Sequence, residues 1–243
     1  MRALWFAVAL LCLALAPKPS VAATAAQMCA QDTDFSAVVT DCTQAINQYA
    51  KDEFLYSMRC WGYAGLGNFT AALADCNQAI ALNPKDEVAY RIRCNTYNIG
   101  LGNHSAALAD CDQAIALNPK DDAAYDDRCT SYNGLGNYTA ALADCNQAIT
   151  LNPTNANAYA NRCVVHWGLG NYAAGLSDCN QAITLNPKNA SAYEDRGSIY
   201  EKQGQNAAAI ADYQKVLTIN PSSQYAQNAL KRLGASPTAP GGG

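Results

Sequence analysis

A six-residue pattern recurs along the chain at intervals of 34 or 35 residues. It reads DCTQAI from residue 41, DCNQAI from 75, DCDQAI from 110, DCNQAI from 144 and 178, and DYQKVL from 212. In a repeat of this length, one supersecondary unit cannot bury its apolar face alone, so neighbouring units must stack. The single interval of 35 comes from an extra residue near Ile99, where YNIGLGN stands in place of YNGLGN.

The residues that begin and end helices divide each repeat into a pair of helices. A segment rich in Ala and Tyr, such as 124–132, leads into a GLGN turn, and a second apolar segment, such as 140–151, ends at Asn-Pro. Glycine ends helices, asparagine caps the start of the next one, and proline cannot continue one. We therefore expect an all-α fold of antiparallel helix hairpins stacked into a solenoid.

The last full repeat carries a pattern of aromatic and small residues. AYEDRGSIYEKQGQNAAAIADYQKVLTINP places them at Tyr193, Gly197, Tyr200, Gly204, Ala209, Tyr213 and Pro221. This arrangement resembles the tetratricopeptide repeat (TPR), and the chain is identified as an exported, cysteine-rich variant of that family. The resemblance implies a right-handed superhelical solenoid whose concave face, lined by the first helix of each repeat, binds proteins or peptides.

The repeat register predicts the domain organisation. A partial repeat is expected at 23–52, and the polar face of a helix at 224–233 would cap the last repeat, followed by a flexible tail at 234–243. The full repeats are expected at 53–86, 87–121, 122–155, 156–189 and 190–223.

Residues 1–22 have the pattern of a secretory signal peptide. Arg2 precedes an apolar run from 3 to 16, and small residues surround a cleavage point after Ala22 or Ala23. The run is shorter than the roughly 20 residues of a membrane-spanning helix. We expect a secreted protein, extracellular or periplasmic, with no membrane insertion after cleavage.

The composition and the charge pattern argue against several classes of function. Half of the residues are hydrophobic and 15% are charged, which is typical of a folded chain. Signal cleavage removes two basic residues and no acid, so the net charge moves from −4 to −6. The chain has no basic stripe, which argues against nucleic acid as a partner. With no clustered nucleophile, base or metal ligands, we expect no enzyme activity, no metal and no cofactor.

Ten of the 11 cysteines remain in the mature chain, an even number that favours disulfides in an exported protein. Pairing within repeats and pairing between neighbouring repeats both place thiols opposite each other across a turn, but only pairing within repeats uses all ten. No C-x-x-C redox motif occurs. The predicted pairs are Cys29–Cys42, Cys60–Cys76, Cys94–Cys111, Cys129–Cys145 and Cys163–Cys179.

Arginine and aspartate also recur in register. Because buried charges need partners, we expect ion pairs rather than an anion-binding ladder, either within or between repeats. Four N-x-S/T sequons are candidate N-glycosylation sites, although an asparagine there can also serve as a helix cap. These sequons begin at Asn68, Asn103, Asn137 and Asn189.

The TPR resemblance places a candidate ligand groove on the first helices. Its expected lining is Phe54, Trp61, Arg91, Asn95, Asp126, Asn133, Asn157, Trp167 and Glu194, with Val164 and Ser198 on the same face. The leading hypothesis is a disulfide-stapled scaffold for an unidentified protein or peptide ligand. The alternative is self-association into an extracellular or cell-surface fibre, with or without glycans.

Overall fold

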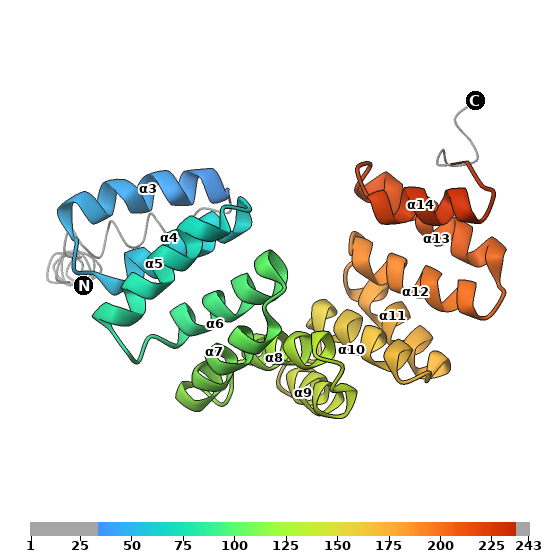
Figure 1. Cartoon of the computed structure of the whole chain (residues 1–243), viewed down its shortest axis with the longest axis horizontal. Coiled ribbons are helices and arrows are strands. Elements are labelled where there is room, and N and C mark those ends of the chain that lie inside the picture. The colour runs from blue at the N-terminus through green and yellow to red at the C-terminus, as the bar shows by residue number, and fades with distance from the viewer. Residues whose placement is uncertain (1–33, 237–243) are drawn as a thin grey trace, which may run out of the picture. The chain divides into compact units, whose positions relative to one another are not determined.

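The computed structural model describes residues 34–236 (Figure 1). Within this part of the chain there are α-helices, one π-helix and no strand, so the all-α expectation is confirmed. The described residues divide into two compact units, with the boundary between Pro84 and Lys85. None of the helices between residues 34 and 236 has the length and apolar character needed to cross a bilayer. The predicted signal peptide, residues 1–22, lies outside the described residues.

From residue 34 onward, the first unit contains three consecutive helices. They are α3 (Phe35–Gln48), α4 (Glu53–Gly65) and α5 (Phe69–Leu82). Each packs on the next, and Val38, Cys42 and Leu55 are fully buried where α3 meets α4. The helices begin after Asp34, Asp52 and Asn68, whose side chains accept hydrogen bonds from backbone N–H groups in the first turn.

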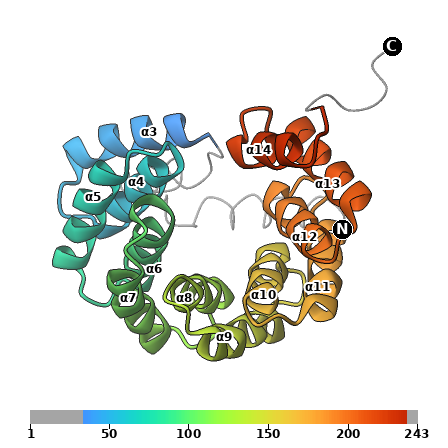
Figure 2. The same cartoon turned by 45° about the vertical axis from the view of Figure 1, so that its right-hand side comes forward.

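The second unit is a stack of four hairpins and a terminal helix. The hairpins are α6 (Glu87–Asn95) with α7 (His104–Leu117), α8 (Asp122–Gly134) with α9 (Tyr138–Leu151), α10 (Ala156–Gly168) with α11 (Tyr172–Leu185), and α12 (Ala190–Lys202) with α13 (Asn206–Ile219). Each helix packs on the next, and α8 and α12 also pack on either side of α10. This consecutive packing is that of a TPR solenoid. Figure 2 shows the first helix of each hairpin on the inner side of this unit's curve and the second on the outer side.

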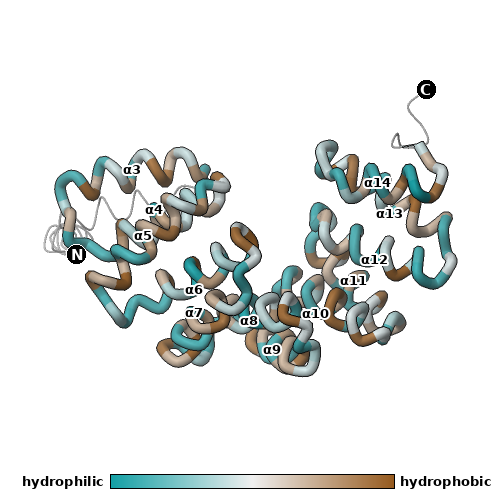
Figure 3. Tube along the Cα trace, viewed as in Figure 1, coloured by the Kyte–Doolittle hydropathy of each residue, from teal (hydrophilic) through white to brown (hydrophobic). Residues whose placement is uncertain are grey.

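The helices alternate hydrophobic and polar positions along their length (Figure 3). Their buried positions are mostly alanine and cysteine, and small side chains allow neighbouring helices to approach closely. One close approach lies at the end of the first helix, just before the turn, at Gly65, Gly134 and Gly168. A Cβ on Gly168 would lie 2.5 Å from the ring of Tyr138, which belongs to the preceding hairpin. Glycine at this point of α10 therefore makes room for an aromatic ring between repeats.

The extra residue near Ile99 is absorbed as a π-helix, η1 (Thr96–Gly100), at the end of α6. In a regular repeat, Asn137 N–H donates to the carbonyl of Tyr132; in this repeat Asn103 N–H donates to that of Tyr97, one residue further back. A π-helix accommodates a single insertion without breaking the helix. The following GLGN turn and the Asn103 cap are consequently unchanged.

The terminal helix α14 (Gln224–Arg232) covers the last hairpin. Ala226, Ala229 and Leu230 are buried against α13, whereas Lys231 is exposed. The expected tail begins in contact with the fold, because Ala235 N–H donates to the Leu230 carbonyl and Gln214 Nε2 donates to the Ser236 carbonyl. Residues 237–243 of that tail lie outside the described residues.

Candidate functional site

Four disulfides join the two helices of single hairpins. Their Cα–Cα distances are 5.4 or 5.5 Å, and every one of these eight cysteines is fully buried. The expected pair Cys29–Cys42 involves Cys29, which lies outside the described residues. Complete burial favours a structural role over thiol reactivity. The four disulfides are Cys60–Cys76, Cys94–Cys111, Cys129–Cys145 and Cys163–Cys179.

The last hairpin has a packed contact in place of a disulfide. Gly197 and Tyr213 occupy the positions of the two cysteines, and a Cβ on Gly197 would lie 2.8 Å from the Tyr213 ring. Tyr213 is fully buried, so its ring fills the space that a disulfide occupies in the other repeats.

The arginine and aspartate columns pair within repeats, which decides the question that the sequence left open. Arg128 is typical: its Nε and Nη2 donate to both oxygens of Asp144 at 2.7 and 2.8 Å. Its guanidinium also stacks on the rings of Tyr125 and Tyr132. The bidentate bond to Asp144 raises the pKa of Arg128. The pairs are Arg59–Asp75, Arg93–Asp110, Arg128–Asp144, Arg162–Asp178 and Arg196–Asp212.

The same arginines also bind the preceding repeat. Nη1 of Arg128 donates to Asp112, and Nη1 of Arg162 donates to Asn146, each at 2.8 Å. Arg128 and Arg162 thus each hold two second helices through one guanidinium, and Arg59 and Arg196 do the same through Thr43 and Asn180. With their donors occupied in this way, these arginines do not form an anion-binding ladder.

The sequence-predicted groove residues of the first unit are aromatic. Phe54 and Trp61 are 39% and 37% exposed on α4. The Trp61 ring packs edge-on against Phe35 with centroids 4.9 Å apart. These two exposed side chains give α4 an apolar face.

The predicted groove residues in the middle of the second unit are bound to one another's helices. Arg91 pairs with Asp121 at 3.1 Å. Asn95 Nδ2 donates to Asp127 at 2.8 Å, from α6 to α8. Asp126 accepts from Asn161 at 2.8 Å, between α8 and α10, and is buried. These contacts tie neighbouring first helices together and leave few free polar groups there.

The remaining predicted groove residues vary in their contacts. Asn133 is half-buried, and Asn157 is exposed and accepts a 3.5 Å hydrogen bond from Asn189. Glu194 accepts a 2.6 Å hydrogen bond from the hydroxyl of Ser223, which caps α14. These polar contacts link the first helices to adjoining turns.

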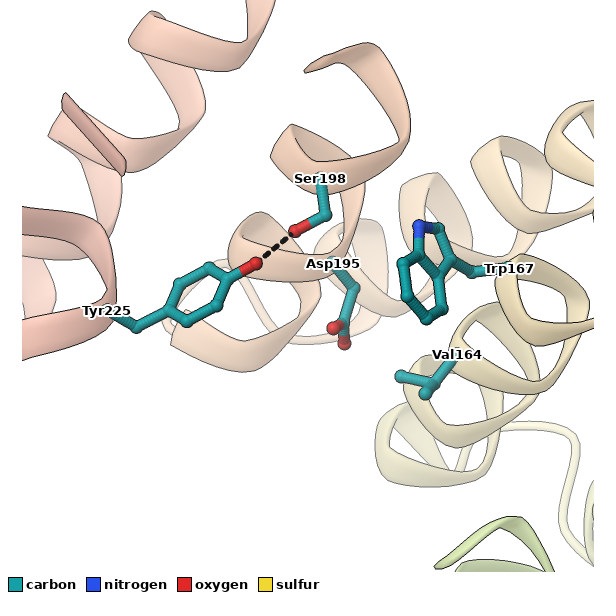
Figure 4. A pocket seen from close by; sticks show the side chains of 5 residues that line it. All are labelled: Val164, Trp167, Asp195, Ser198 and Tyr225. Atoms are coloured by element: carbon teal, nitrogen blue, oxygen red, sulfur yellow. Dashed lines mark hydrogen bonds between the residues drawn. The ribbon is translucent and has the colours of Figure 1, made fainter. Parts of the chain in front are cut away.

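A pocket of about 120 Å³ lies at the C-terminal part of this inner face (Figure 4). Val164 and Trp167 come from α10, Asp195 and Ser198 from α12, and Tyr225 from α14. Tyr225 and Ser198 share a 2.8 Å hydrogen bond. Trp167 was expected at the groove from the sequence, whereas Asp195 and Tyr225 were missed. Tyr225 is the second residue of α14, as Phe54 is of α4, so comparing these two helices in register is a signal that could have placed Tyr225 at the groove.

Three carboxyl groups on the inner face have raised pKa values. Burial raises the pKa of Asp126 to about 6, partly offset by the Asn161 hydrogen bond. Burial raises that of Asp127 to about 7, partly offset by the Asn95 bond. Burial and the nearby Glu194 charge raise that of Asp195 to about 7, with no compensating hydrogen bond.

The four candidate glycosylation asparagines are all helix caps. Asn68, Asn103 and Asn137 are exposed, and their Oδ1 atoms accept hydrogen bonds from the first turn of α5, α7 and α9. Asn189 caps α12 in the same way and is half-buried. The cap uses the amide oxygen and leaves the nitrogen, the atom a glycan would join, on the surface at the three exposed sites.

The two histidines have packing roles. His104 is half-buried, with Nδ1 3.1 Å from Asn98 Oδ1, and its ring lies against Gly134. His166 lies with Nε2 3.6 Å from Asp178, and burial lowers its pKa. Between residues 34 and 236, no three or more His, Cys, Asp or Glu side chains cluster in a way that could hold a metal ion.

The hairpin stack and its inner face define an all-α repeat protein. Tetratricopeptide-repeat family profiles match residues 63–86, 131–170 and 164–224. The chain is therefore a tetratricopeptide-repeat protein, in which buried cysteine pairs distinguish most of the repeats. A sequence comparison with curated proteins gives no significant match.

Several solved structures share the fold. A tetratricopeptide repeat protein from Parabacteroides merdae is 23% identical with a TM-score of 0.71, covering 89% of this chain and 86% of that chain. PilW, a type IV pilus biogenesis factor, is 16% identical with a TM-score of 0.72, and the match covers 88% of this chain and 100% of that chain. YrrB, a TPR protein with an unusual peptide-binding site, is 20% identical with a TM-score of 0.52, and the match covers 78% of this chain and 97% of that chain. At these identities the likeness is one of fold.

Proposed function

We propose that this chain is an exported, non-enzymatic scaffold that binds a protein or peptide on the inner face of its first helices. The observation that carries the proposal is the Trp167 pocket. Trp167 is 40% exposed beside a concave pocket, in a unit whose other inner-face polar groups are largely bonded to one another. Exposed aromatic residues beside a pocket are typical anchors of binding interfaces.

The likeness to known proteins supports the same class of function. YrrB has the same repeat fold and a peptide-binding site. Stacked repeats expose a long concave surface that several separate contacts can share, which suits an extended ligand. Neither the sequence motifs nor the described side chains supply a reason to propose catalysis.

Export is supported by the cysteine chemistry. Disulfides persist in oxidising compartments, and here they lie fully buried inside hairpins whose cores otherwise consist largely of alanine. A protein that depends on such bonds suits the extracellular space or a periplasm. The apolar segment at 3–16, after Arg2, would direct it there.

A display library of random peptides, selected on the oxidised chain, tests the binding proposal. We expect peptides whose affinity falls about tenfold or more on Trp167→Ala, as for an aromatic hot spot. Leu169→Ala is the matched control, because Leu169 is 39% exposed in the turn that follows Trp167 and does not line the pocket. Failure to select any peptide, or equal losses for the two variants, would contradict the proposal.

A further inference from the structure

The residue after the cysteine of one first helix and the residue before the arginine of a neighbouring first helix differ between two parts of the stack. Asn95 follows Cys94 on α6 and donates to Asp127, which precedes Arg128 on α8. In the later pair of helices, α10 and α12, the residue after Cys163 is Val164 and the residue before Arg196 is Asp195. Valine cannot donate a hydrogen bond, so the carboxylate of Asp195 lacks the partner that Asp127 has.

The surrounding cations are also engaged elsewhere. Within residues 34–236, no hydrogen-bond donor or cation contacts the Asp195 carboxylate. Arg196 binds both oxygens of Asp212, and Arg232 binds both oxygens of Glu201. Figure 4 shows the Asp195 carboxylate directed into the open space between Val164 and Tyr225. The carboxylate is half-buried and still reaches that space, because it lines the pocket.

The other polar group of the pocket is an acceptor as well. The hydroxyl of Ser198 donates to the carbonyl of Glu194 at 2.8 Å, so its oxygen accepts from the hydroxyl of Tyr225. The hydroxyl of Tyr213 also lies 3.4 Å from Ser198 Oγ, but it donates its proton to Glu201 at 3.1 Å. One lone pair of Ser198 Oγ therefore remains for a ligand. The pocket therefore presents acceptors to a ligand and no free side-chain donor apart from the indole N–H of Trp167.

The walls suit an aliphatic stem that ends in a cation. Val164 and the Trp167 ring form an apolar side, and Tyr225 is 51% exposed opposite them. A cation over an indole or phenol face gains a favourable interaction, which strengthens as the cation is desolvated. The volume of about 120 Å³ is that of a side chain rather than of a whole small molecule.

We propose that this pocket binds the lysine side chain of a peptide or protein ligand, with its ammonium on Asp195 and Ser198 and its stem between Val164 and Trp167. This inference rests on the proposed function, since it names the side chain that the inner face recognises. Lysine fits better than arginine because an ammonium has three donors on a compact head, whereas a guanidinium would bring five donors to two acceptor groups.

The test compares peptides selected from the random library on the wild-type chain and on Asp195→Asn. The wild-type chain should enrich peptides with a lysine at a fixed position, and Asp195→Asn should not. For a selected peptide, Asp195→Asn should weaken binding about tenfold, because hydrogen bonds to charged groups are the stronger ones. The norleucine derivative of that peptide should bind both chains equally.

Val164→Asn supplies a second variant that leaves the carboxylate in place. The introduced amide would donate to Asp195 as Asn95 donates to Asp127, and should likewise weaken the lysine peptide relative to its norleucine derivative. Peptides selected without lysine enrichment would overturn the lysine assignment while the proposed function stood. An arginine derivative that binds as tightly as the lysine peptide would overturn it too. If no peptide is selected at all, the proposed function itself fails.

Discussion

Cys129 and Cys145 are bonded across one hairpin with their Cα atoms 5.5 Å apart, at the place that Gly197 and Tyr213 fill in the last repeat. The same point between two helices is thus occupied either by a disulfide or by an aromatic ring against glycine. Four hairpins are closed covalently in this way, and the last one is closed by packing alone. The rest of the hairpin interior is small, with Ala141 and Ala148 buried next to Cys145 on α9.

Removal of this disulfide should cost stability without changing the fold. The double variant Cys129→Ser with Cys145→Ser opens a loop with a sequence separation of 16 residues. The chain-entropy account gives at most about 3 kcal/mol for a loop of this size. Urea unfolding of the oxidised proteins followed by circular dichroism measures the loss. An unchanged unfolding midpoint would show that the hairpin does not depend on its disulfide.

The bidentate pair of Arg128 and Asp144 should matter more than its second contact to Asp112. Asp144→Asn leaves a mostly buried guanidinium without its main partner and should destabilise the chain by about 3 kcal/mol. Asp112→Asn is the control, because that side chain is 58% exposed and surface pairs contribute about 1 kcal/mol or less. Equal losses in urea unfolding would contradict this ranking.

Stability should fall as pH rises from about 4 to about 7. The pKa of Asp127 rises from 3.8 to about 7 in the folded chain because burial disfavours its charged form. The folded state therefore binds more protons than the unfolded state in this interval, so deprotonation on raising the pH favours unfolding. Asp126 and Asp195 act in the same direction. Asp195→Asn should flatten the pH dependence of the unfolding midpoint, and an unchanged slope would refute the assignment.

Deletion of Ile99 should be tolerated. Ile99 is 70% exposed within the π-helix, and its removal gives the sequence YNGLGN of the sister repeats. We expect an α-helical turn in its place and a midpoint close to that of the parent chain. Deletion of Ser131, a fully buried residue of the regular helix α8, is the control and should destabilise strongly, since it shifts the register of the packed face. Strong destabilisation by both deletions would contradict this.

Intact-mass measurement under non-reducing conditions, with disulfide mapping, tests the proposed export together with the disulfide pairing. We expect cleavage after Ala22 or Ala23 and five disulfides, each within one repeat, including Cys29–Cys42. Any glycan should appear as added mass on Asn68, Asn103 or Asn137, the exposed caps. Free thiols in the exported protein, or links between neighbouring repeats, would contradict the pairing.

Much of the fold could be predicted from the sequence because its determinants are local. Gly, Asn and Pro recur where helices end and begin, and the first helices of the hairpins start at residues 53, 87, 122, 156 and 190. The joint replacement of the two cysteines by Gly197 and Tyr213 is a signal in the sequence for the contact between these residues. The single extra residue at Ile99 indicated an irregularity in that repeat, but the sequence did not predict that it would take the form of a π-helix.

The pocket was harder to predict because it depends on contacts between repeats. Asp195 and Tyr225 lie 30 residues apart and meet only because α14 packs on the last hairpin. The pairing of arginine with aspartate was left open for a similar reason, since spacing alone does not distinguish the same hairpin from the next one. Comparison of Val164 with Asn95 in register is the signal that could have revealed the unpaired carboxylate.

The most direct test of the account is hydrogen exchange of the oxidised chain with and without a selected peptide. Binding on the inner face predicts new protection in α10, α12 and the start of α14, the helices that carry the pocket, and unchanged exchange in the outer helices α11 and α13. Protection confined to α11 and α13 would contradict the account.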